Sequence, residues 1–139
     1  MMIGNKVKNV ARQGAPAKSK VLFEVKNLYR PQDSAFSVTL RNISIAANAG
    51  EIFGIAGIAG NGQGELMSAL IGEWRGSDAG VMVLDGVDVS LKNPAERRVA
   101  HMGFIPEERN GHAAVPSMSL ADNALLTSHS LVELVRRGV

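Results

Sequence analysis

The sequence contains no cysteine, so it has neither a disulfide framework nor a thiolate metal site. No apolar run approaches the roughly 20 residues that a helix needs to span a bilayer, and no signal-peptide pattern opens the chain. The three histidines, His101, His112 and His129, do not have the spacing of metal ligands. These absences exclude a disulfide-rich scaffold, a membrane-spanning helix and a histidine–cysteine metal centre.

Acidic side chains are missing from the first 20 residues, which carry five basic ones: Lys6, Lys8, Arg12, Lys18 and Lys20. Because the whole chain has a formal charge of +2, residues 21–139 carry −3. A polar segment rich in Asn, Gln, Ala and Lys is typical of a linker, which is predicted for residues 1–20. The alternative is a basic arm for nucleic acid, but no aromatic side chains are interleaved with the basic ones, so no nucleic-acid partner is predicted.

Residues 52–66, IFGIAGIAGNGQGEL, join a short apolar run to a glycine-rich loop and the start of a helix. Gly57 and Gly62 have the spacing of the P-loop pattern G-x-x-x-x-G-K-[ST], but Gln63 and Gly64 replace its lysine and its hydroxyl residue. The backbone N–H groups of such a loop, together with the helix N-terminus, form a nest for phosphate. Gln63 donates only neutral hydrogen bonds and Gly64 offers no Mg²⁺ ligand, so the stretch predicts binding without efficient hydrolysis.

Three other interpretations of this stretch remain open. In the first, the glycines only allow a strand and a helix to pack closely. In the second, the stretch is a dinucleotide-binding G-x-G-x-x-G, which fits poorly because Glu65 stands where the third glycine belongs. In the third, the chain is a small P-loop kinase, which fits poorly because phosphoryl transfer depends on the missing charge and metal.

Strands and helices alternate along the rest of the chain. The patterns predict strands at 21–25, 52–56, 81–84 and 102–105, and a strand pair at 36–40 and 43–47 joined through Arg41 and Asn42. They predict helices at about 63–73, 95–101, 121–128 and 131–139. Asp85 follows an apolar strand, as a magnesium-binding aspartate does in NTPases, but Gly86 comes next, which favours a plain hairpin turn.

These features together resemble the ATP-binding domain of ABC transporters, and more narrowly the second ATPase domain of bacterial nucleoside and simple-sugar import ATP-binding proteins. The resemblance covers about residues 21–128. It is carried by VLFEVKNL at 21–28, LRNISIAANAGEIFGIAGIAGNGQGEL at 40–66, VMVLDGVDVS at 81–90 and GFIPEERNGHAAVPSMSLADNALL at 103–126. GNGQ at 60–63 and IPEER at 105–109 are its most specific parts.

The resemblance implies an α/β fold: a partial P-loop NTPase domain with an antiparallel β-subdomain and a mixed central sheet. Residues 21–128 are then the N-terminal part of the nucleotide-binding domain, and 129–139 begin a truncated helical subdomain. The LSGGQ-type signature, the Walker B strand that ends in an acidic residue and the switch histidine of the family are not in the sequence. The chain is therefore expected to be a fragment that does not hydrolyse ATP alone.

The resemblance also assigns site residues. The phosphate loop would consist of Gly57, Gly60, Asn61, Gly62, Gln63, Gly64 and Glu65. Glu107 falls at the position of the family's metal-sensing glutamine and is the candidate for holding Mg²⁺ through water. In the alternative interpretation, Glu107 or Glu108 is a surface partner of Arg109. Tyr29 and Phe36 are the nearby candidates for the aromatic residue that stacks on adenine, although neither is cleanly in register.

The function implied is the ATP-binding component of an importer for nucleosides or simple sugars, with ATP as cofactor and Mg²⁺ weak or absent at this site. Its expected partners are a second ATPase domain, paired head to tail, and transmembrane permease subunits, with no direct membrane insertion. The expected location is the cytoplasmic face of the plasma membrane. The alternative function is a docking module that no longer holds nucleotide and pairs with a partner ATPase and the membrane subunit.

Overall fold

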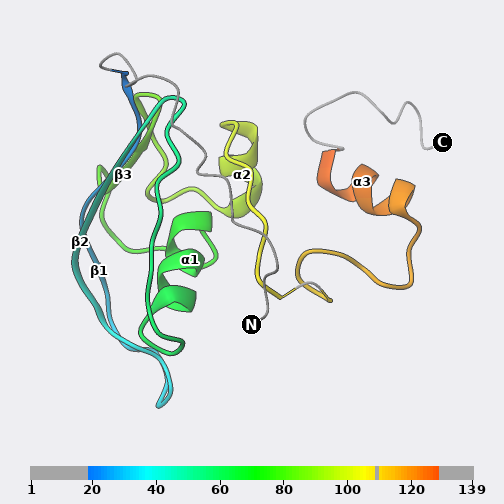
Figure 1. Cartoon of the computed structure of the whole chain (residues 1–139), viewed down its shortest axis with the longest axis horizontal. Helices are drawn as coiled ribbons and strands as arrows, with labels where there is room; N and C mark the ends of the chain where they lie inside the picture. The colour runs from blue at the N-terminus through cyan, green and yellow to red at the C-terminus, as the bar shows by residue number, and fades with distance from the viewer. Residues whose placement is uncertain (1–18, 109, 129–139) are drawn as a thin grey trace, which may run out of the picture.

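The computed structural model describes residues 19–108 and 110–128 (Figure 1). The predicted linker, apart from Ser19 and Lys20, lies outside the described residues. So do Arg109, His129 and the predicted helix at 131–139, and the proposed boundary at residue 129 therefore stays a prediction.

A four-stranded antiparallel sheet forms one layer of the fold, in the order β2-β1-β3-β4. Its strands are β1 (Val21–Arg30), β2 (Leu40–Asn48), β3 (Met82–Leu84) and β4 (Val87–Asp88). Val25 stands at the centre, opposite Ile45 on one side and Met82 on the other. The predicted strands at 21–25 and 81–84 are thus confirmed, and the antiparallel part of the predicted fold is present.

Helix α1 (Gln63–Ile71) packs against this sheet (Figure 1). Its Leu66 and Ala69 join the buried core, which otherwise consists of Val25, Leu28, Leu40, Met82 and Val89. The helix begins after Gly62 and ends at Gly72, both with left-handed backbone, and the Gly72 N–H closes the last turn on Ala69 O. The sequence predicted this helix, and also that Trp74 packs beyond its end.

Two shorter helices follow: α2 (Pro94–Val99) and α3 (Leu120–Ser128). Pro94 stands in the first turn of α2, and Asn93 and Glu96 cap that turn reciprocally. Helix α3 has no buried residue. Both helices confirm the predictions from sequence, and among the described residues no helix has the length and apolarity to cross a bilayer.

Arg97 of α2 fastens that helix to the C-terminal end of α1. Its side chain is fully buried, and its guanidinium donates hydrogen bonds to the main-chain oxygens of Ala69, Leu70, Ser90 and Lys92 over 2.6–3.0 Å. Burial lowers the pKa of Arg97 from its ordinary value. One side chain thus satisfies two of the last carbonyls of α1 and the turn that leads into α2.

The Asp85–Gly86 turn joins β3 to β4, as the hairpin interpretation predicted. Both residues have positive φ, +46° and +82°, the backbone of a tight two-residue hairpin turn. Lys20 forms an ion pair with the Asp85 carboxylate, and this hydrogen bond lowers the pKa of Asp85. The magnesium-site interpretation of Asp85 has no support in this geometry.

The predicted strand at 43–47 is confirmed as part of β2, but the strand at 36–40 and the pairing of the two are wrong, because β2 runs unbroken from Leu40 to Asn48. Asn42 has φ +54° within β2 and Asn27 has φ +49° within β1, where the pairing register shifts. Asparagine tolerates this left-handed backbone, so each residue forms an irregularity inside a strand. Asn42 was predicted to lie in a turn between two strands, because asparagine is a turn-forming residue, whereas it forms a bulge inside β2.

The predicted strands at 52–56 and 102–105 are also wrong, since neither segment pairs in the described part of the chain. Both segments are largely exposed, with 99% of Ile52 and 86% of Ile105 accessible to solvent. Their residues favour strand, but a strand forms only where a neighbour supplies the hydrogen bonds. The mixed central sheet expected from the resemblance is therefore not formed within residues 19–108 and 110–128.

Candidate functional site

The glycine-rich loop enters α1 through two left-handed glycines. Gly60 has φ +85° and Gly62, the residue that precedes α1, has φ +98°. The N–H of Asn61 lies between them and bonds to Ile58 O over 3.2 Å, which closes a tight turn. The backbone conformation that a phosphate nest requires of glycine is thus found at two of the predicted loop positions.

The N-terminus of α1 is left uncapped by side chains. Gly62 supplies no side-chain acceptor, and within the described residues the N–H groups of Gln63, Gly64 and Glu65 have no hydrogen-bond partner. These three donors carry the positive end of the helix dipole. The first turn can therefore accept an anion without breaking an existing bond.

Gln63 folds its side chain back over the loop. Its Nε2 donates to Ile58 O over 2.9 Å, and its Oε1 accepts the Asn61 N–H over 3.2 Å. The amide therefore bonds to the loop backbone itself, on the side where a Cβ at Gly57 would touch Nε2. Gly57, Asn61 and Gln63, which were predicted from sequence as one loop, do lie together.

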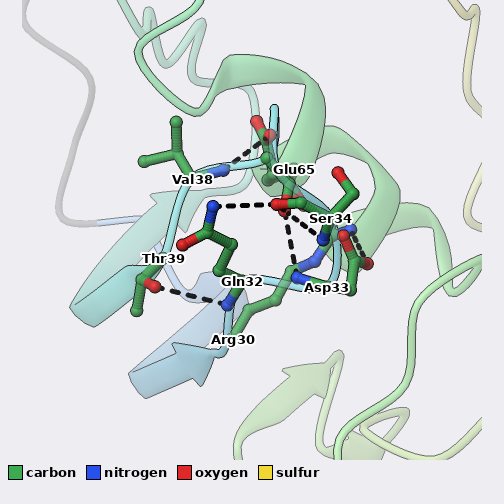
Figure 2. Close-up of polar contacts among 8 residues, drawn as sticks. Arg30, Gln32, Asp33, Ser34, Val38, Thr39 and Glu65 are labelled. Atoms are coloured by element: carbon green, nitrogen blue, oxygen red, sulfur yellow. Dashed lines mark hydrogen bonds and ion pairs between the residues drawn. The ribbon is translucent and has the colours of Figure 1, made fainter.

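Glu65 points away from the loop, toward the connection between β1 and β2 (Figure 2). Its Oε1 accepts the Val38 N–H over 3.0 Å, and its main-chain oxygen accepts a bond from Arg30 Nη1 over 2.8 Å. The carboxylate thus anchors the connection and does not face an anion site. The side chain of Glu65 thus makes a structural contact, while its backbone N–H stays at the first turn of α1.

Arg30 holds the other end of this connection. Its side chain is buried, its Nη2 donates to Asp33 Oδ2 over 2.8 Å, and its guanidinium lies 5.6 Å from the ring centre of Trp74. The hydrogen bond from Arg30, and then that from Ser37, lowers the pKa of Asp33. Figure 2 shows Asp33 and Arg30 beside Glu65, so one cluster joins β1, the connection and the start of α1.

The connection between β1 and β2 carries one of the two candidate aromatic residues. Ser37 Oγ accepts the N–H groups of Asp33 and Ser34 over 3.0 Å each, and Thr39 Oγ1 accepts the Gln32 N–H over 3.3 Å. Phe36 stands at this turn with 97% of its surface exposed. Tyr29 is also exposed, on β1. Neither side chain is part of the core cluster.

A cavity of about 400 Å³ lies beside α1. It brings Gln63 and Gly64 together with Glu107, so three of the predicted site residues share one space although 43 positions separate Gly64 from Glu107. Its apolar wall consists of Ile55, Leu66, Met67, Leu70, Ile71 and Pro106. Ser68, Glu73, Glu108 and His112 complete the lining, and no lysine or arginine stands among the described residues that form it.

His112 is a residue of this site that the sequence did not single out. Its Nε2 pairs with Glu73 Oε1, which joins the segment after residue 108 to the end of α1. The two residues lie 39 positions apart, and no local pattern links them. Within the described residues, no group of three or more His, Asp or Glu side chains is arranged to hold a metal ion.

The chemistry available at the loop is anion binding by neutral donors. Backbone N–H groups and the Gln63 amide can bind phosphate oxygens. Because Gln63 and Gly64 replace the lysine and the hydroxyl residue, the loop cannot neutralise a terminal phosphate or supply a hydroxyl ligand to Mg²⁺, and no described lysine or arginine lines the adjoining cavity. Glu107 is exposed and belongs to no described group of three or more side chains that could hold a metal ion.

Comparison with known proteins gives relatives along most of the chain. It is 34% identical over 128 residues to a ribose import ATP-binding protein of Rubrobacter xylanophilus and 32% identical over 129 residues to a nucleoside import ATP-binding protein of Lactococcus lactis. These alignments take in 92% and 93% of the chain. Over 91 residues, or 66% of the chain, it is 38% identical to a guanosine import ATP-binding protein of Bacillus subtilis.

The chain spans about a quarter of the length of the first two relatives, 24% and 25%, and 18% of the third. No family model matches it. No solved structure matches it either.

Proposed function

We propose that this chain is the nucleotide-binding part of an importer for nucleosides or simple sugars, because its homologues are ABC import ATP-binding proteins. The observation that carries the proposal is the loop before α1. Two left-handed glycines lead into a helix whose first three N–H groups have no partner among the described residues.

The phosphates of ATP bind at this helix terminus. The N–H groups of Gln63, Gly64 and Glu65 donate to phosphate oxygens, and Gly60 and Gly62 keep the backbone open to them. Gly57 and Asn61 complete the loop. Mg²⁺ is weakly held or absent, because Gly64 has no side-chain ligand and Glu107 acts only through water.

The whole protein couples ATP to solute uptake. Its nucleotide-binding domain pairs head to tail with a second ATPase domain and docks on transmembrane permease subunits at the cytoplasmic face of the plasma membrane, without inserting into it. No nucleic acid takes part. By itself the chain binds ATP and does not turn it over, because it lacks the groups that stabilise phosphoryl transfer.

Calorimetric titration of ATP into the chain, with Mg²⁺ and again with EDTA, tests this function. We expect binding in both, with affinities that agree within about tenfold, because the metal has few ligands at the site. Absence of binding by a folded chain would reject the nucleotide site. Binding that disappears in EDTA would contradict the proposal that Mg²⁺ is weakly held or absent. ATP turnover above background would contradict the proposal that the chain alone does not hydrolyse ATP.

A second function is favoured by one observation. The Gln63 amide already occupies hydrogen-bonding groups of the loop, and the neighbouring cavity carries Glu73, Glu107 and Glu108 without a lysine or arginine among its described residues. A docking module without nucleotide fits this arrangement. Co-purification with the permease partner separates the two functions, because docking is indifferent to ATP whereas the nucleotide-binding role predicts that ATP changes the amount recovered.

A further inference from the structure

Arg30 carries a buried positive charge beside the first turn of α1. Only 7% of the residue is exposed. Its Nη1 donates to the main-chain oxygen of Glu65 over 2.8 Å, and its Nη2 donates to Asp33 Oδ2 over 2.8 Å (Figure 2). Its Nε has no hydrogen-bond partner among the described residues. Arg30 is therefore a buried cation whose donors are only partly satisfied.

This arrangement is costly if Arg30 only fastens the connection between β1 and β2. Burial removes the hydration of the guanidinium, and the unpaired Nε adds the cost of a lost hydrogen bond. The Asp33 carboxylate compensates only in part, because 51% of its side chain is exposed and solvent screens its charge. The connection is also held to α1 without any cation, since Glu65 Oε1 accepts the Val38 N–H. Fastening alone therefore does not account for the charge.

The position of the charge at the start of α1 favours an anion as its second partner. Glu65 is the third residue of α1, and the N–H groups of Gln63, Gly64 and Glu65 have no partner among the described residues. A helix dipole disfavours a cation at its N-terminus, so Arg30 and these donors interact unfavourably until an anion binds there. The loop itself has no lysine to attract that anion, because Gln63 stands at its position. Since Arg30 is buried, solvent screens its field only weakly.

We propose that Arg30 is a positioning residue of the phosphate site, which fixes the first turn of α1 through Glu65 O and supplies part of the positive charge that the loop lacks. It acts on phosphate through the first turn of α1 and does not touch it. Asp33 pairs with the same guanidinium and so weakens its attraction for phosphate. The inference rests on the proposed function, because it concerns the same anion site.

Calorimetric titration of ATP, and separately of pyrophosphate, into the 139-residue chain and its variants tests the inference. Arg30→Met removes the charge and the bond to Glu65 O, and is expected to weaken the binding of both ligands by about fivefold or more. Asp33→Asn retains an acceptor oxygen for Arg30 but removes the negative charge, and is expected to tighten both by about twofold to threefold. A merely structural role predicts the opposite sign for Asp33→Asn, because a loosened cluster would bind phosphate less well.

Two further variants complete the test. Glu24→Gln is the matched control for net charge, because Glu24 pairs with Lys26 on β1 about 20 Å along the strand from Arg30, and it should leave both affinities unchanged. Arg30→Lys keeps the charge and should bind within about twofold of the parent, and it replaces Arg30→Met if circular dichroism shows that variant unfolded.

Three results would overturn the inference and leave the nucleotide site in place: equal binding by the parent and Arg30→Met, weaker binding by Asp33→Asn, or a folded Arg30→Lys that binds about fivefold or more weakly than the parent. Absence of binding of both ligands by the folded parent would overturn the inference and the proposed function together.

Discussion

Gly57 and Gln63 face each other across the glycine-rich loop, so closely that a Cβ on Gly57 would overlap with Nε2 of Gln63. The glycine makes room for the folded-back amide, which donates to Ile58 O and accepts the Asn61 N–H. The loop therefore supplies its own acceptor to one of the N–H groups that a phosphate oxygen would use. A phosphate oxygen bound at the first turn of α1 would have to displace this contact only if it also took up the Asn61 N–H.

Replacement of Gln63 by lysine is expected to tighten ATP binding by about tenfold or more, because a hydrogen bond to a charged donor contributes more than a neutral one. Gln63→Met is the matched control, since it removes the amide without adding a charge. Calorimetric titration of the three proteins measures the effect. Equal affinity of the lysine and methionine variants would show that phosphate does not approach this position.

Gly72→Ala is expected to destabilise the fold by about 2 kcal/mol or more. Gly72 has φ +89°, and a Cβ there would lie 2.6 Å from Lys92 O and 2.8 Å from Arg97 Nε, both fixed parts of the α1–α2 junction. Gly80→Ala is the control, because Gly80 has φ +78° and open space around it. Urea unfolding followed by Trp74 fluorescence should give a clearly lower midpoint for Gly72→Ala, and equal midpoints would contradict the crowding at Gly72.

Glu65→Ala is expected to cost about 1–3 kcal/mol, since it leaves the Val38 N–H without its acceptor. Glu65→Gln retains an acceptor oxygen and should lose less than half as much. Exchange of the Val38 amide should accelerate in the alanine variant and stay slow in the glutamine variant. If both variants bind ATP as the parent does, Glu65 is structural; a loss of ATP binding with the fold intact would return it to the phosphate site.

The pH dependence of stability contains a contribution from Asp88. Hydrogen bonds from the hydroxyl and N–H of Ser90, and one from the Gly80 N–H, lower the pKa of Asp88 below its ordinary value of 3.8. A lowered folded-state pKa stabilises the fold above pH 3.8, and this stabilisation is lost as the pH falls through the folded value. In Asp88→Asn the urea midpoint should change less with pH between about pH 5 and pH 3 than in the parent. The same pH dependence in both proteins would contradict this role.

Elements with local signals were predictable from sequence, and elements that depend on distant partners were not. The glycine-rich loop up to Gly62 marks the start of α1, Asp85–Gly86 marks the hairpin, and Pro94 marks the first turn of α2. The unpaired segments at 52–56 and 102–105 have the composition of strands, but composition does not tell whether a neighbour is present.

The family resemblance was predictable, and the homologous import ATP-binding proteins confirm it. The residue-level site remains a prediction. Sequence grouped Glu65 with the loop because the motif is contiguous, whereas the helix turns its carboxylate toward Val38. No sequence pattern predicted the contact between His112 and Glu73, which forms only when the chain folds back along α1.

The most direct test of the nucleotide site is calorimetric titration of Mg-ATP into the parent chain, Gly60→Asp and Gly50→Asp. Both glycines have positive φ, +85° and +72°, and no neighbouring atom within 4 Å of a Cβ, so the two aspartates impose similar backbone strain. Only the one at Gly60 adds a carboxylate to the phosphate nest. We expect binding by the parent and Gly50→Asp and none by Gly60→Asp, with equal circular dichroism for all three. Equal binding by all three, or none by the folded parent, would contradict a backbone phosphate site at this loop.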